Sequence, residues 1–298
     1  RAWDDIEAFY EETGGRWDEL IRLLEKEAGA SGLEPEHKLT VQMKMAALWL
    51  DKQQKPDRAA TCYEEVLKLE PNQREAAQAL VSLYEQLNDA GALARALEIG
   101  LGHLEDPSER YATMVRIGGL FAESLSKPAD AFGWYAKAFA LDASQPELCD
   151  GLEVVAGKAD RVEQLVALYR SALKEGRVAD ELAMRQRTAS LLDQVLGRPE
   201  EALRDWEEVL SGDPTNADAL VAIERLYTQM GRFEDLLAIL DKRRGIAASA
   251  EEENEILVHV ARVWEEALGK RDRAIEVYRQ VLDARGDAPE ILRALQRL

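Results

Sequence analysis

Four short segments of the chain repeat at an almost constant spacing, and this repeat restricts the chain to a modular fold. Each segment starts with Lys or Arg and ends with alanine, and the segments are residues 55–59, 127–131, 198–202 and 270–274. Their alanines lie 72, 71 and 72 residues apart. A period that recurs over 298 residues indicates similar units that are stacked next to one another.

An aromatic residue follows each of these alanines four residues later, which is one turn of a helix. The aromatics are Tyr63, Tyr135, Trp206 and Tyr278, and we expect all four in the core. A second series of apolar residues, Leu20, Leu93, Leu165 and Leu236, lies between them at spacings of 73, 72 and 71. The structural unit is therefore half the period, about 36 residues, which is enough for two helices and two turns.

The first helix of alternate units has one position that stays small, where we expect two helices to approach closely. This position holds Ala46, Gly118, Ala189 and Ala261. In the remaining units the same position holds Glu7, Val81, Glu153 and Glu224, and we expect different packing there.

These residues resemble the tetratricopeptide repeat. The spacing of Trp3, Ile6 and Tyr10 is similar to the first half of the family pattern. Ala59 with Tyr63 and Pro71 resembles the second half, as does Ala202 with Trp206 and Pro214. The likeness extends over essentially the whole chain as a degenerate array with a double-hairpin period of about 72 residues.

The resemblance implies an all-α fold, an α-solenoid or superhelical array of about eight helical hairpins plus a terminal helix. We expect one solenoid over residues 1–298. Its hairpins are expected at about 1–36, 37–71, 72–106, 107–143, 144–178, 179–214, 215–248 and 249–286, with an extra helix at 287–298. Because the first residue is Arg1 and not Met, and the helical pattern has already begun by Trp3, we expect a fragment of a longer protein.

Charge argues against several classes of partner. The net charge is −19, which opposes binding to nucleic acid and to anionic membrane surfaces. No apolar run is long enough to cross a bilayer, so we expect a soluble chain without membrane insertion, and a cytoplasmic location. The abundance of Ala, Glu, Arg and Leu is typical of a bacterial protein.

The pattern of reactive residues does not indicate an enzyme. The chain lacks glycine-rich phosphate-binding loops, and its three histidines, His37, His103 and His259, are far apart in the repeat. Cys62 and Cys149 lie among apolar residues and are expected to be buried thiols. We therefore expect no catalysis, no cofactor and no metal ion.

The resemblance places a binding groove on the first helices of the hairpins. By register with the family, the positions facing it are Met43, Ala47, Gln78, Ser82, Val115, Gly119, Asp150, Val154, Gln186, Ser190, Val221, Arg225, Val258, Arg262, Arg293 and Arg297. Among them Arg225, Arg262 and Arg297 form a row, one in each successive hairpin, which could hold carboxylates of a partner. The competing interpretation is that these arginines pair with Glu224, Glu265 or Glu266 nearby.

The family's Lys and Asn positions for acidic C-terminal peptides hold Met43, Ala47 and Ser82 here, which disfavours that ligand. We therefore expect a scaffold or adaptor that binds a peptide or helix of a partner protein. The alternative is a regulatory or sensory segment of a larger protein that responds to a peptide or small ligand. An RNA-binding helical repeat is disfavoured by the acidic charge.

Overall fold

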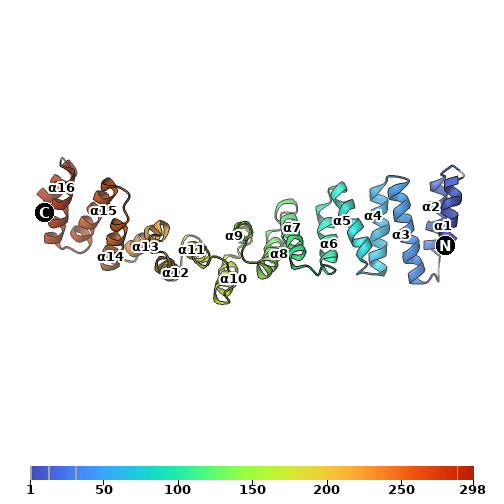
Figure 1. Ribbon diagram of the computed structural model, residues 1–298, viewed down its shortest axis with the longest axis horizontal. Coiled ribbons are helices and arrows are strands. Elements are labelled where there is room, and N and C mark those ends of the chain that lie inside the picture. The colour runs from blue at the N-terminus through green and yellow to red at the C-terminus, as the bar shows by residue number, and fades with distance from the viewer. Residues whose placement is uncertain (1, 13, 31, 287) are drawn as a thin grey trace. The chain divides into compact units, whose positions relative to one another are not determined.

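The computed structural model describes residues 2–12, 14–30, 32–286 and 288–298, and throughout these ranges the regular secondary structure is helical (Figure 1). The chain divides into two compact units, unit 1 at Arg1–Arg161 and unit 2 at Val162–Leu298. Unit 1 contains α1 (Ala2–Glu12), α2 (Trp17–Ala28), α3 (Pro35–Asp51), α4 (Pro56–Leu69), α5 (Arg74–Leu87), α6 (Ala90–Leu101), α7 (Pro107–Gly119), η1 (Leu120–Ser124), α8 (Pro128–Leu141) and α9 (Pro146–Ala159). Unit 2 contains α10 (Val162–Lys174), α11 (Glu181–Ser190), η2 (Leu191–Val195), α12 (Pro199–Gly212), α13 (Ala217–Gln229), α14 (Phe233–Gly245), α15 (Ala250–Arg262), η3 (Val263–Ala267), α16 (Arg271–Arg285) and α17 (Pro289–Arg297).

Within each unit the helices pack mainly against their neighbours in sequence, which confirms the predicted α-solenoid of tetratricopeptide-like hairpins. We call α1, α3, α5, α7, α9, α11, α13, α15 and α17 the A-helices, since each occupies the register of the first helix of a hairpin. That the two units continue one solenoid stays a prediction.

The A-helices of alternate hairpins end in a shared way that explains the long period. A short π-helical turn, η1, η2 or η3, closes α7, α11 and α15, and a residue with positive φ follows it at Ser126, Gly197 or Gly269. Gln54 has the same conformation after α3. This left-handed residue ends the helix and turns the chain into the next one, which begins with proline in three of the four cases.

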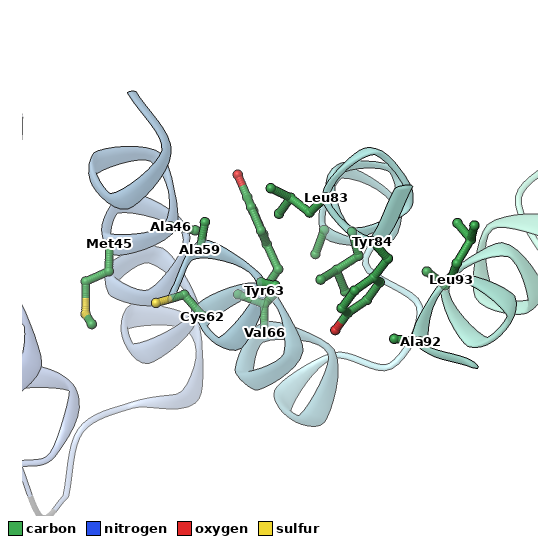
Figure 2. Packing of buried hydrophobic residues seen from close by; sticks show 14 of the residues in the cluster. Met45, Ala46, Ala59, Cys62, Tyr63, Val66, Leu83, Tyr84, Ala92 and Leu93 are labelled. Atoms are coloured by element: carbon green, nitrogen blue, oxygen red, sulfur yellow. The ribbon is translucent and has the colours of Figure 1, made fainter. Parts of the chain in front are cut away.

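The core of unit 1 is formed where α3, α4, α5 and α6 meet. Figure 2 shows Tyr63 of α4 between Ala46 of α3 and Leu83 of α5, and it shows Tyr84 of α5 beside Ala92 of α6. Each of these side chains is at most 9% exposed. Because one hairpin supplies only part of each contact, its core is completed by its neighbour.

Unit 2 is built in the same way. Trp206 and Tyr278 are 4% and 2% exposed, and the small positions Ala189 and Ala261 are fully buried beside them. Burial of each such large side chain contributes about 1.5 to 3 kcal/mol. The predicted small position is therefore confirmed in both units, since Ala46 and Gly118 are buried as well.

The structure bears on two further sequence-based expectations, the place of Trp3 in the repeat pattern and the lack of a membrane-spanning segment, only within its described residues. The side chain of Trp3 lies outside the described side chains. Across the described ranges, every helix is too short or too polar to cross a bilayer.

Candidate binding surface

The predicted groove positions fall into four equivalent sets, each repeated through the long period. The first contains Met43, Val115, Gln186 and Val258; the second Ala47, Gly119, Ser190 and Arg262; the third Gln78, Asp150, Val221 and Arg293; and the fourth Ser82, Val154, Arg225 and Arg297. We call the surface formed by these positions the A-face of each unit. All sixteen side chains or glycine positions are exposed or half-exposed.

The A-face is accessible because the same helices bury other positions. In α13, Leu220 and Ile223 are fully buried, whereas Val221 is 51% exposed. In α9, Leu152 is fully buried and Val154 is 55% exposed. Apolar side chains exposed in register on one face are a feature of binding surfaces.

Ion pairs and hydrogen bonds join neighbouring A-helices along this face. In unit 1, Lys52 Nζ lies 2.8 Å from Glu11 Oε1, and Arg116 pairs with Glu85. In unit 2, Gln186 Nε2 donates to Asp218 Oδ2 over 2.9 Å. These contacts use polar groups that would otherwise be free to bind a ligand.

The predicted arginine row is not uniform. Arg225 pairs with Asp193 in η2, and Arg297 Nε lies 2.9 Å from Glu265 Oε1 in η3. Both acidic side chains are well covered, at 6% and 10% exposure. Arg262, by contrast, forms no ion pair with any side chain that the structure describes.

The competing interpretation of the row is therefore correct for Arg297 and Glu265, while Arg225 uses a different partner. Sequence reasoning missed Asp193. It lies 32 residues before Arg225, and Glu265 lies 32 residues before Arg297, so the repeated spacing could have found both pairs.

Glu224, which occupies the position that is small in alternate hairpins, is held by two helices. Its carboxylate accepts from Arg243 of α14 over 2.6 Å, and His259 Nδ1 of α15 lies 3.1 Å away. Burial tends to raise the pKa of Glu224, but the hydrogen bonds from His259 and Arg243 outweigh burial and lower it. His259 thus has a structural contact with Glu224.

A cavity of about 450 Å³ lies on the A-face of unit 2, next to α15, α16 and α17. Four predicted residues line it, Val258, Arg262, Arg293 and Arg297, and Tyr278 and Glu266 line it as well. Burial, and then the hydrogen bond that the Tyr278 hydroxyl donates to Glu265, raises the pKa of Tyr278 to about 12.

A second cavity of about 310 Å³ lies on the A-face of unit 1, between α1 and α3. Met43 and Ala47 line it, with Glu7, Lys44 and Lys52 at its polar side. Its lysines are engaged, because Lys44 Nζ is 3.6 Å from Glu7 Oε2 and Lys52 contacts Glu11.

The middle of unit 1 differs from the sequence-based expectation, since Tyr135 is only half-buried. Its ring packs on Gly118 and Gly151. A Cβ atom on Gly118 would lie 2.4 Å from the Tyr135 ring, and one on Gly151 would lie 3.3 Å from it. The ring therefore lies against glycine backbone on both sides.

The described residues contain no group of three or more His, Cys, Asp or Glu side chains that could hold a metal ion. Cys62 and Cys149 are buried free thiols, as expected. Burial raises the pKa of the Cys62 thiol to about 11.

Two family models match the chain. Residues 151–243 match one described as "Tetratrico peptide repeat", and residues 258–292 match one described as "Tetratricopeptide repeat". No curated protein sequence matches the chain.

Several solved structures are similar to this chain at low identity. YrrB, described as a TPR protein with an unusual peptide-binding site, is 16% identical over 69% of this chain and 100% of its own, with a TM-score of 0.41. PilW, a type IV pilus biogenesis factor, is 16% identical over 86% and 98%, with a TM-score of 0.33. The C-terminal part of a TPR repeat-containing protein from Cytophaga hutchinsonii is 10% identical over 85% and 99%, with a TM-score of 0.44.

The two family matches fall on the helical hairpins whose register the long period predicts, with the small position and the aromatic packed as that register requires. Residues 151–243 and 258–292 therefore carry tetratricopeptide repeats, which serve in general as protein-interaction scaffolds.

Proposed function

We propose that this protein is a non-catalytic scaffold or adaptor that holds a peptide or helix of a partner protein on its A-face. The observation that carries the proposal is the exposure of all four sets of A-face positions while the remaining sides of the same helices form the core. Val154 and Val221 illustrate this exposure, because each is more than half exposed on a helix with fully buried neighbours.

The chemistry of the A-face varies along the chain, and this variation supports selective rather than general binding. Unit 1 presents small or apolar groups such as Ala47 and Val154, whereas unit 2 presents Arg225, Arg262 and Arg297. A partner segment with an apolar part and an acidic part would match both kinds of surface.

Site-specific photo-crosslinking in the full-length protein tests the proposal. A photoreactive amino acid replaces Ala47, Ser82 or Val221 on the A-face, and as matched controls it replaces Ala140 in α8 or Ala238 in α14, which are exposed on the second helices. We expect crosslinks to one and the same polypeptide from the A-face positions and not from the controls. Crosslinks to that polypeptide mainly from Ala140 and Ala238 would contradict the proposal.

A further inference from the structure

We infer that the cavity beside α15, α16 and α17 is an anion subsite that binds a glutamate or aspartate side chain of a partner segment. The inference deepens the proposed function and rests on it, since it assigns the chemistry of one part of the A-face. It commits to a side-chain carboxylate within the segment, not to a chain terminus.

The cavity brings guanidinium groups from two helices together. Arg262 comes from the end of α15, while Arg293 and Arg297 come from α17. Ile291 of α17 and Tyr278 of α16 complete the wall, and both side chains are 2% exposed. The volume of about 450 Å³ can admit a side chain that enters from solvent.

The cavity lining has more positive charge than its carboxylates neutralise. Arg297 is neutralised by Glu265, which also accepts from Tyr278. Arg262 and Arg293 form no ion pair with the side chains described in the structure. Glu290 lies on the wall but approaches Arg285 at 3.6 Å, so Glu266 is the carboxylate left to oppose these two arginines.

The equivalent place one period earlier shows what is special here. There Ser190 and Val221 stand where the cavity has Arg262 and Arg293. The ion pair between Arg297 and Glu265 does have an equivalent there, which is the pair of Arg225 with Asp193. An arginine–carboxylate ion pair between neighbouring A-helices is thus common to both interfaces. The two additional arginines belong to the C-terminal interface, and stacking of the hairpins does not require them.

A carboxylate fits this arrangement better than a neutral group. Guanidinium groups bind carboxylates through paired, charge-assisted hydrogen bonds, and two guanidinium groups can hold one carboxylate from two sides. Val258 and Ala294 on the wall offer apolar contact for the methylene groups of glutamate. The protein as a whole is acidic, at −19, so this local surplus of positive charge also discriminates against binding elsewhere on its surface.

The probe is a glutamate-rich helical peptide that is acetylated at its start and amidated at its end, so that it carries no terminal carboxylate. Its counterpart has glutamine in place of every glutamate. Binding of both to the intact chain is measured by fluorescence anisotropy at low ionic strength. We expect the glutamate peptide to bind and the glutamine peptide to bind about tenfold more weakly or not at all.

Three variants locate the site. The double variant Arg262→Gln with Arg293→Gln should weaken binding of the glutamate peptide by about tenfold. The matched control, Arg271→Gln with Arg279→Gln, removes the same charge from exposed positions of α16 outside the cavity and should leave binding unchanged. Glu266→Gln should tighten binding severalfold, because it removes the opposing carboxylate.

Several results would overturn the subsite. Equal binding of the two peptides would exclude carboxylate recognition, and an equal loss in the two double variants would indicate nonspecific attraction. Tighter binding of succinate than of the glutamate peptide would assign the cavity to a free dicarboxylate instead. If the crosslinks from Ala47, Ser82 and Val221 persist while the cavity variants bind normally, the proposed function stands and the subsite fails.

Discussion

The surroundings of Tyr135 and of Tyr278 occupy the same place in the long period and yet are built differently. Tyr278 is 2% exposed and donates to Glu265, which in turn holds Arg297 of the next A-helix. Tyr135 is half-buried and lies on Gly118, with Gly151 facing it from α9. One interface is closed by a polar link between hairpins and the other by contact between a ring and glycine backbone.

The difference shows that the repeat register determines the backbone position of an aromatic residue but not the packing of its ring. At the Tyr135 interface, Ala122 stands where η3 has Glu265, and Val154 stands where α17 has Arg297. That place offers no acceptor for the Tyr135 hydroxyl, and the missing Cβ atom of Gly118 lets the ring pack on the helix backbone. Tyr135 is therefore less deeply buried than the equivalent tyrosine in unit 2, which is 2% exposed.

The largest expected effect is the loss of stability on truncating the buried ring. Tyr278→Ala should lower the free energy of unfolding by about 3 to 5 kcal/mol because it leaves a cavity in the core of unit 2. Tyr135→Ala should cost about 1 to 3 kcal/mol, since a half-buried ring loses less contact. Native-state hydrogen exchange of the amides in α16 and α8 measures the two local costs. An equal or larger cost at Tyr135 would remove the distinction between the interfaces.

Filling the space beneath the Tyr135 ring should also destabilise unit 1. Gly118→Ala places a methyl group 2.4 Å from the present position of the ring, and overpacking of this kind costs about 1 to 3 kcal/mol. Gly119→Ala is the matched control, because its nearest contact would be the Tyr135 hydroxyl at 3.7 Å, an ordinary distance. Urea unfolding followed by circular dichroism compares them, and a Gly118→Ala chain as stable as the control would contradict this packing.

The smallest expected effect concerns alkaline pH. The folded state raises the pKa of Tyr278 from 10.0 to about 12, so it retains the phenol proton where the unfolded chain loses it. The contribution is complete below pH 10.0 and is lost as the pH rises towards about 12. At pH near 11 the loss amounts to about 1 kcal/mol. Tyr278→Phe should reduce the alkaline slope of the unfolding free energy, and an unchanged slope would argue against the buried phenol.

Much of the fold follows from the repeat, because helical spacing and turn chemistry act locally. The small position of the first helix and the aromatic of the second helix mark where helices meet, and Ala261 with Tyr278 confirms this in the structure. The open sides of the A-helices are expected by register with the tetratricopeptide repeat. For this reason the accessibility of positions such as Ala47 and Arg262 could be predicted.

The partners of long polar side chains could not be predicted in the same way. Several carboxylates lie within reach of each arginine, and the choice among them depends on small rotations that the sequence pattern does not determine. Arg225 selects Asp193 in η2, and the formation of η2 itself depends on how α11 ends. The position of the Tyr135 ring likewise depends on two glycines, Gly118 and Gly151, which lie in successive A-helices.

Cysteine accessibility tests most directly the central claim that each A-helix buries one side and leaves its A-face open. Single cysteines replace Ala47 and Ser190 on the A-face and Ala46 and Ala189 in the core, in a background in which the buried native cysteines are left in place. Labelling with a maleimide under native conditions should be rapid for Ala47→Cys and Ser190→Cys, and should require unfolding for Ala46→Cys and Ala189→Cys. Similar labelling rates at adjacent positions such as 46 and 47 would contradict the account.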